Sequence, residues 1–412
     1  MNRTSFLCLF LTLLLCAAAV PSRATIVVGG SDGWAFSTDG NVNMFAAYET
    51  GSNRPDFEGI RRGGTLPDGQ EGYRQRIGFV PNWLAFNIKS PTIGGLDMAA
   101  RISFCPTFDS KEIGKSKNSF GNHIDLREVF FTVDGNFGQI LVGKTLSLYQ
   151  GTNLLTDMLI WGHGTNGAID GGGTPLGRIG YGYVYPQFNA QVRYTTPDLR
   201  GFKVALGLYD PSVIVGPNAA AEETKLPRVE SELSYAGSYA NGSYKGWVSA
   251  MYQSAKFKRD SGFSGNVEAY GVAGGIQVLH GDFELVLSGF ENQGVGSLLM
   301  LDLDSLDSAG KERDGRGYIA QVMYGFDHHW GHTKVGLSYG ANIMDETRAD
   351  RRDRRDGLEV QIKNQRMTGL GIYHDINPHL KLIAEYIYTD NKWFDGRGQN
   401  THLVAVGTFF TW

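Results

Sequence analysis

The sequence predicts an all-β protein that forms a transmembrane, antiparallel β-barrel of sixteen strands. Three observations lead to this prediction. Runs of strand length alternate apolar with polar side chains, and the connections between these runs alternate between short and long. The chain of 412 residues is also polar overall, with 56 glycines and a mean hydropathy of −0.22. No run of about 18 or more apolar residues follows the N-terminal segment, which argues against helical membrane spans.

The first 24 residues have the features of a secretory signal peptide. Arg3 supplies the positive charge, an apolar stretch runs from Phe6 to Val20, and Ser22-Arg23-Ala24 offers a small-x-small cleavage site. We therefore expect residues 1–24 to be removed and residues 25–412 to form one barrel domain. Cys105 is then the only cysteine of the mature chain, so no intrachain disulfide can form. The formal net charge of −4 implies no nucleic-acid partner.

Strands are expected along the whole mature chain. Their number is even, as a closed bacterial barrel requires, and their short connections carry residues typical of tight turns. The expected strands lie near residues 41–49, 72–89, 95–108, 122–133, 139–148, 178–195, 201–210, 229–241, 243–254, 266–279, 282–291, 315–327, 331–344, 357–373, 379–391 and 400–412. The long connections lie near residues 50–71, 109–121, 149–177, 211–228, 255–265, 292–314, 345–356 and 392–399. A soluble β-sandwich has no reason to alternate its connections in this way.

Several expected strands have a period of two, so that one face can meet lipid and the other water. In the strand near 379–391, for example, Leu382 and Tyr386 alternate with Lys381 and Glu385. Aromatic residues near strand ends are expected in the girdles at the two membrane interfaces. These residues are Tyr181, Tyr183, Tyr185, Tyr252, Tyr324 and Trp393.

The strand near 122–133 does not follow this pattern. Val129, Phe131 and Val133 share their parity with Arg127, so that apolar side chains and a charge fall on one face. Packing of this wall against a neighbouring subunit would explain the pattern.

The stretch from Asn122 to Gly182 contains the most informative pattern. Two β-rich runs flank the turn in DGNFG, and the second run opens into a segment near 149–177 that is rich in Gly, Thr and Asn. A connection of this length in a compact fold is usually functional or disordered. Its elements, in order, are Arg127, NFGQ, Gly143-Lys144, Thr156-Asp157-Met158-Leu159 and Gly177-Arg178-Ile179-Gly180.

This order of elements resembles that of the general diffusion porins of Gram-negative outer membranes. The resemblance implies a trimeric barrel in the outer membrane, exported through the periplasm, whose third extracellular loop, residues 149–177, folds into the pore. It also implies that Asp157 lies at the constriction, opposite a basic wall of Arg76, Arg127 and Arg178. Arg101 is our own addition to this wall, because in its strand it lies among the polar residues that alternate with the apolar ones. A carboxylate opposite several guanidinium groups sets a field across a pore and favours small polar solutes.

The chain departs from the family pattern after Thr-Asp-Met-Leu. Many members have Pro-Glu there, whereas this chain has Ile160-Trp161, so the second carboxylate of the loop is missing. Asp170 could replace it, and Trp161 and His163 add an aromatic ring and a titratable group. The preference for anions or cations and the native solutes therefore stay open.

The end of the chain carries a second resemblance. Val404, Val406, Phe410 and Trp412 share one parity, and a terminal aromatic with another two residues earlier resembles the assembly signal of outer-membrane barrels. Phe410 and Trp412 are assigned to this signal. The resemblance implies as partners the barrel assembly machinery, lipopolysaccharide and outer-membrane lipid.

Three functions remain in competition. The first is a water-filled porin for passive diffusion of small hydrophilic solutes and ions. The second is a substrate-selective channel for organic anions, and the third is an outer-membrane barrel enzyme, for which no catalytic motif is found. No cofactor is expected, because the glycine-rich stretches GGSDG and GAIDGGG lack the following Lys-Ser/Thr or helix of a phosphate-binding loop. His328, His329 and His332 with Asp327 are a candidate metal site, but no metal is expected because adjacent histidines point to opposite sides of a strand. The charged run from Thr347 to Gly357 is interpreted as a solvated loop.

Overall fold

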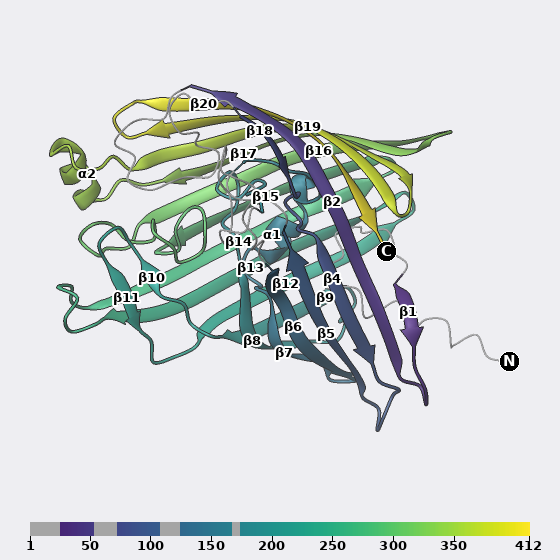
Figure 1. The fold of residues 1–412 in the computed structure, drawn as a ribbon. Coiled ribbons are helices and arrows are strands. Elements are labelled where there is room, and N and C mark those ends of the chain that lie inside the picture. Colours follow the sequence, from purple (N-terminus) through teal and green to yellow (C-terminus); the bar gives the residue numbers. More distant parts are fainter. Residues whose placement is uncertain (1–24, 53–71, 108–123, 167–173) are drawn as a thin grey trace.

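A closed, antiparallel β-barrel of sixteen strands forms the protein, as the sequence predicts (Figure 1). The computed structural model describes residues 25–52, 72–107, 124–166 and 174–412, so the expected signal peptide lies outside the described residues. Consecutive strands pair along the chain, and β20 (Gly398–Thr411) pairs with β2 (Ala35–Gly51) to close the ring. The second strand is provided by β3 (Gly72–Arg76) and β4 (Trp83–Lys89) together. The remaining strands are β5 (Asp97–Pro106), β6 (Ile124–Gly135), β7 (Gly138–Leu146), β8 (Phe188–Thr195), β9 (Phe202–Tyr209), β12 (Arg228–Tyr239), β13 (Gly242–Phe257), β14 (Asn266–His280), β15 (Phe283–Gln293), β16 (Asp314–His328), β17 (Gly331–Met344), β18 (Ile362–Asn377) and β19 (Leu380–Trp393).

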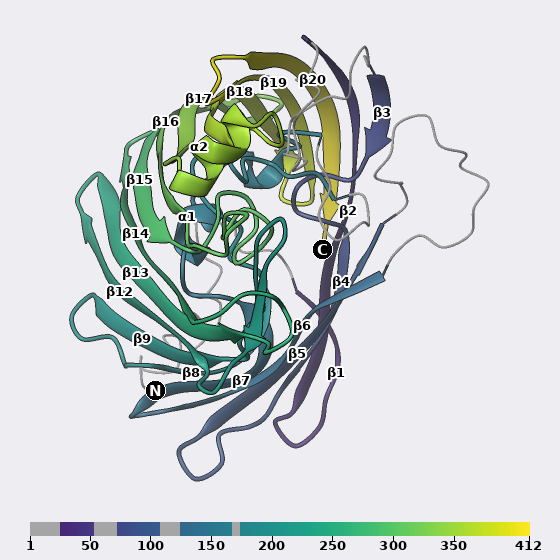
Figure 2. The same ribbon diagram turned by 90° about the vertical axis from the view of Figure 1, so that its left-hand side faces the viewer.

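The two ends of the barrel differ in their connections. Short turns join the strands at one end, the short-turn end, and long connections join them at the other, the long-loop end. The long-loop end carries the helix α2 (Arg348–Arg355) and the hairpin of β10 (Ile214–Val215) and β11 (Ala220–Glu223), and Figure 2 looks into this end. A further short strand, β1 (Ile26–Gly29), pairs with β2.

The predicted alternation between an outer and an inner face is present in the barrel wall. In β16, Tyr318, Val322 and Tyr324 are exposed, whereas Ile319 and Gln321 between them are buried. Exposed apolar side chains of this kind suit a lipid environment, and the opposite parity faces the barrel interior. We call these the outer and the inner face.

A β-bulge explains the irregular pattern of β6. Ser103 pairs with Glu128 and Phe104 pairs with Leu126, which leaves Arg127 as an extra residue. Because the bulge reverses the parity, Arg127 is buried on the inner face while Val129 and Phe131 are exposed on the outer face. The expectation that these apolar side chains share a face with Arg127 is therefore wrong.

Two expected strands are interrupted. The run near 72–89 breaks between β3 and β4, where Gly78 N donates to Asn43 Oδ1 at 2.6 Å and Asn43 N donates to Asn82 Oδ1 at 2.7 Å. These side-chain bonds replace ladder bonds around Pro81, which has no N–H to donate. The strand expected near 178–195 begins only at Phe188, because Pro186 and two glycines of positive φ precede it.

Four of the aromatic residues assigned to the interfacial girdles are buried instead. Tyr181, Tyr183 and Tyr185 lie in the irregular segment before β8, and Trp393 packs with Met344 and Ile362 on the inner face. Tyr252 and Tyr324 are exposed, as expected. A hydroxyl or indole group at a strand end therefore did not distinguish an outer position from an inner one.

The charged run near 347–357 is a helix, not a loop. Thr347 caps α2 by accepting from Asp350 N at 3.1 Å, and Thr347 N donates to the Asp350 carboxylate at 3.1 Å. This reciprocal capping box satisfies N–H groups that a helix start otherwise leaves unpaired. Among the residues that the structure describes, no helix has both the length and the apolar composition to cross a bilayer.

Candidate functional site

The long connection after β7 forms two short helical turns. The helix α1 (Gly151–Leu155) is followed by the 3₁₀ turn η2 (Met158–Trp161). Asp157 begins η2, because its Oδ1 accepts from Leu159 N at 3.2 Å. We call residues 148–166 the bridging segment, since its two halves bond to different parts of the barrel wall.

The first half of the bridging segment bonds to β12 and β13. Tyr149 N donates to Glu230 Oε2 at 2.9 Å, and Gln150 N donates to Ser249 Oγ at 3.2 Å. Trp247 Nε1 donates to Asn153 Oδ1 at 2.8 Å. All three wall residues lie on the inner face, so α1 is held against the inside of this wall.

The second half bonds to β16 and β19. Met158 N donates to Gln321 Oε1 at 2.7 Å, while His163 N and Gly164 N donate to Glu385 Oε2 at 2.8 and 3.1 Å. The other oxygen of Glu385 accepts from Tyr373 at 2.9 Å. A buried carboxylate thus receives three hydrogen bonds, which compensate for its removal from water.

Asp157 and Arg178 form a buried ion pair. Arg178 Nε lies 3.2 Å from Asp157 Oδ1, and both side chains are 0% exposed. Tyr183 donates to Asp157 Oδ2 at 3.0 Å, and Arg178 also donates to the Ser338 hydroxyl. The pair joins the middle of the bridging segment to the irregular segment before β8 and to β17. Neither charge is in contact with solvent in this conformation.

Arg76 is also buried, at the end of the bridging segment. Its Nη1 donates to the Asn166 carbonyl, and Asn166 Nδ2 donates to Glu49 Oε2 at 2.8 Å. Next to it, burial and the positive charge of Arg76 lower the pKa of His163 to about 3. His163 is therefore neutral at ordinary pH and does not act there as the titratable group that the sequence suggests.

Arg101 and Arg127 belong to a second cluster. Arg101 donates to Asp39 Oδ2 and to Glu128 Oε2, both at 2.6 Å, and Arg127 donates to Asp125 Oδ2 at 2.7 Å. Asp39, Arg101, Asp125 and Glu128 keep 17–23% of their side chains exposed. The structure thus brings Asp157, Arg178 and Arg76 together at the bridging segment, and places Arg101 and Arg127 in a separate, partly hydrated cluster. That all five set the charge of a constriction stays a prediction.

The three carboxylates of the second cluster were missed by sequence reasoning. Asp125 and Glu128 flank Arg127 in the run IDLREV, and this proximity was a usable signal. Asp39 lies far away in the sequence, and only the register of β2 with β4 and β5 brings it to Arg101.

Other residues singled out in the sequence have structural surroundings. The ring of Trp161 packs edge-on against Phe409, with centroids 5.6 Å apart, and Asp170 lies outside the described residues. Thr333 Oγ1 lies 2.9 Å from His328 Nε2 and 3.0 Å from His374 Nδ1. Within the described ranges, no group of three or more His, Cys, Asp or Glu side chains is arranged to hold a metal ion.

The C-terminal aromatic residues lie where β20 meets β2. Trp412 N donates to the Gly40 carbonyl at 3.1 Å, and Gly40 N donates back to Trp412 at 3.0 Å. Phe410 is exposed on the outer face, and its ring centroid lies 5.9 Å from that of Trp412. Both residues therefore lie at the seam that closes the barrel.

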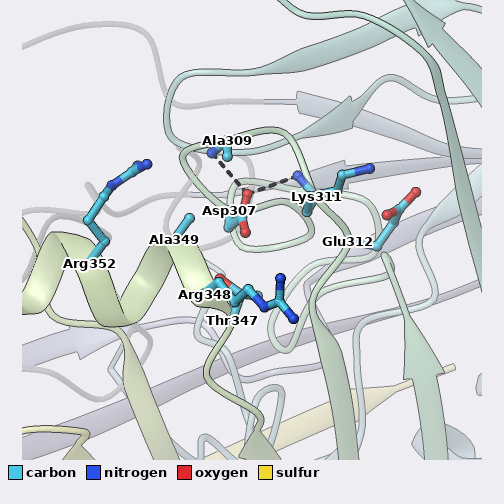
Figure 3. Close-up of a pocket in the computed structure, with 8 residues that line it drawn as sticks. All are labelled: Asp307, Ala309, Lys311, Glu312, Thr347, Arg348, Ala349 and Arg352. Atoms are coloured by element: carbon cyan, nitrogen blue, oxygen red, sulfur yellow. Dashed lines mark hydrogen bonds between the residues drawn. The ribbon is translucent and has the colours of Figure 1, made fainter.

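A cavity of about 370 Å³ lies at the long-loop end, between α2 and the connection that precedes β16 (Figure 3). One oxygen of the Asp307 carboxylate is engaged there, because Oδ1 accepts from Ala309 N and Lys311 N, both at 2.9 Å. Nearby, Arg313 Nη2 lies 2.7 Å from Asp350 Oδ1. Burial alone would raise the pKa of Asp350, but the positive charge and hydrogen bond of Arg313 outweigh it. The pKa of Asp350 therefore lies below its ordinary value. The pair fastens α2 to the neighbouring connection.

Comparisons with known proteins agree with this architecture. The family model described as Gram-negative porin matches residues 11–393. The outer-membrane channel DcaP of Acinetobacter baumannii is similar in structure, with a TM-score of 0.68, 15% identity, and coverage of 93% of this chain and 99% of that one. The anion-selective porin from Comamonas acidovorans has a TM-score of 0.59 and 12% identity, covering 92% and 100%. The trimer form of OmpT, an outer membrane protein of Vibrio cholerae, has a TM-score of 0.53 and 12% identity, covering 92% and 100%. No curated protein matches the sequence.

Proposed function

Since the chain belongs to the Gram-negative porin family, we propose that the molecules crossing its channel are small hydrophilic solutes and ions. The protein is an outer-membrane β-barrel that forms a channel for passive solute diffusion. The family and the fold point to a channel rather than to an enzyme. Residues 1–24 are its signal peptide and residues 25–412 its barrel domain.

The observation that carries this proposal is the partly hydrated charge cluster on the inner wall. Asp39, Arg101 and Glu128 lie on inner positions of β2, β5 and β6, with β4 between β2 and β5, and each keeps contact with solvent. Charged side chains of both signs on an inner wall suit an aqueous path for polar solutes, because they hold water and exclude apolar molecules.

Residues 149–177 form the constriction of this path. Support comes from the bridging segment, whose hydrogen bonds end on inner-face residues of β12 and β13 on one side and of β16 and β19 on the other. A segment fastened at both halves to inner positions narrows the space between the walls. Asp157 and Arg178 form its central anchor, and Arg76 fastens its end through Asn166.

The five predicted residues then act in two ways. Arg101 and Arg127, with their carboxylate partners, touch the aqueous path, while Asp157, Arg178 and Arg76 position the segment and contribute to the field from behind it. The field of a buried charge in a low-dielectric wall is screened less than that of an exposed one.

Assembly and partners follow the family. We take the functional unit to be a homotrimer, as in the OmpT trimer form, embedded in outer-membrane lipid and lipopolysaccharide after delivery by the barrel assembly machinery. The exposed outer face of β6, with Val129 and Phe131, and that of β20, with Val404 and Val406, offer apolar surface for lipid or for a neighbouring subunit.

The reversal potential under a tenfold KCl gradient tests the constriction. Arg127→Gln leaves Asp125 without its ion pair and should make the channel more permeable to cations. Asp157→Asn leaves Arg178 without its counter-charge and should make it more permeable to anions. Both shifts should shrink at molar salt, where the Debye length is about 3 Å. If the two variants shift the potential in the same direction, or not at all at low salt, the constriction is elsewhere.

A further inference from the structure

Four charged side chains lie together on the inner face of β8, β9, β12 and β13. They are Arg193, Lys203, Glu232 and Lys245. Lys203 pairs in register with Ser234, two residues from Glu232, and Arg193 pairs with Gly207. Glu232 attracts Lys245 and Arg193 electrostatically, whereas Lys203 and Lys245 are close enough to repel each other. We call these four residues the basic cluster.

Most inner cations elsewhere in the described chain have a carboxylate partner. The pairs are Arg101 with Asp39 and Glu128, Arg127 with Asp125, Arg178 with Asp157, Arg228 with Glu230, Lys334 with Glu284 and Lys381 with Asp375. In the same described ranges, Arg193, Lys203 and Lys245 form no salt bridge. The basic cluster therefore differs from the rest of the inner wall by three cations without a salt bridge, of which Lys245 has its Nζ over the ring of Trp247, 5.9 Å from the centroid.

Arg193 is the most unusual member of the cluster. Its side chain is only 5% exposed, yet its Nε has no hydrogen-bond partner. A buried N–H donor without an acceptor costs free energy, because it has given up water and gained no hydrogen bond in return. The inner position of Arg193 turns its side chain toward the barrel interior, and because Nε itself is shielded from solvent, an anion meets the Nη groups of the guanidinium.

Glu232 does not neutralise the cluster. Its Oε2 accepts from the Thr152 hydroxyl of α1 at 2.7 Å, and it forms no salt bridge within the described chain. One carboxylate among three cations leaves a formal excess of two positive charges. The bond to Thr152 also places the cluster directly beside the bridging segment, and thus beside the constriction assigned above.

We propose that the basic cluster is a binding subsite for small solutes that carry a carboxylate or phosphate group, and this proposal rests on the channel function above. The planar guanidinium of Arg193 matches the two oxygens of such a group, and Lys203 and Lys245 add charge without demanding a fixed geometry. Chloride has no oxygen fork and binds less well. Oxyanions therefore dwell at the cluster and interrupt the chloride current while they do so.

Full-length protein in planar bilayers tests this subsite. KCl current is recorded while acetate or inorganic phosphate is added, and the half-blocking concentration is measured. Arg193→Gln should raise this concentration at least about tenfold, the effect of losing a charge-assisted hydrogen-bond pair. Lys203→Gln and Lys245→Gln should raise it about threefold each, and they serve if the arginine variant does not assemble. Arg259→Gln and Lys225→Gln, which remove the same charges from exposed connections, should change nothing.

The outcomes separate the two proposals. Block by acetate alone identifies carboxylate solutes, block by phosphate alone identifies phosphate solutes, and block by both supports the shared oxyanion site. A parent channel that conducts KCl but is blocked by neither anion overturns the subsite and leaves the porin function intact. Equal effects of Arg193→Gln and Arg259→Gln also overturn it. A parent that inserts without conducting refutes the channel itself.

Discussion

Replacing Gly162 by alanine should detach the second half of the bridging segment. Gly162 has an extended backbone with a φ of −106°, so a side chain causes no backbone strain. An added Cβ would instead overlap the carboxylate of Glu385, which Tyr373 and the two amides of the segment hold in place. Either Glu385 or the segment must move, and both movements break the bonds from His163 N and Gly164 N.

The size of the effect follows from these two bonds. A hydrogen bond to a charged group contributes about 1.5–3 kcal/mol, so losing both costs about 3–6 kcal/mol. At 1.4 kcal/mol for each factor of ten, the equilibrium between the attached and the detached segment shifts at least about 100-fold. The barrel itself should remain folded, because the ladder bonds of its strands are unchanged.

Amide hydrogen exchange of the assembled protein in detergent measures this shift. Exchange in residues 158–166 should accelerate at least about 100-fold in Gly162→Ala, if exchange proceeds through local opening. Gly151→Ala is the matched control, since its Cβ would meet only Leu146 at 3.7 Å, an ordinary contact, and alanine favours a helix. Equal exchange in the two variants would refute the assigned role of Glu385 as the anchor of the segment.

Two further predictions concern the ends of the barrel. Asp350→Asn should speed tryptic cleavage within α2 at neutral pH relative to Asp395→Asn, because it leaves the buried Arg313 without its counter-charge. The pKa of Asp350 is lowered in the folded protein, so the ion pair stabilises α2 fully above the ordinary pKa of 3.8. This stabilisation is lost as the pH falls through the lower pKa of the folded protein. Protection of α2 from trypsin that already disappears near pH 6 would contradict this. Trp412→Ala should reduce the amount of assembled protein in the outer membrane far more than it changes the conductance of each inserted channel, and wild-type amounts on heat-modifiability gels would count against it.

The barrel could be predicted from the sequence because lipid and water impose a simple pattern on each strand. Leu382 and Tyr386 alternate with Glu385 whatever their partners are, and the turn residues mark where each strand ends. Even so, the outer and inner faces of β6 were misassigned at Arg127. A bulge inserts one residue without any special side chain, so nothing in the sequence distinguishes it from a regular strand.

The charges of the site could be found in the sequence, but their pairing could not. Asp157 and Arg178 are both predicted as site residues. However, two charges that face each other across a water-filled pore and two charges in a direct buried ion pair require the same residue types, so the sequence does not distinguish the two arrangements. The pairing of Arg101 with Asp39 depends on strand register, which is set by many residues at once. The capping box of Thr347 and Asp350 was a readable signal for α2, but the helix has no apolar face, so periodicity did not reveal it.

Conductance of the purified, full-length protein in planar bilayers tests the central claim most directly. A water-filled channel for passive diffusion should have a conductance proportional to the bulk KCl concentration. A trimer should open or close in three steps of equal conductance. Folded protein that inserts into the bilayer without conducting ions would contradict the account.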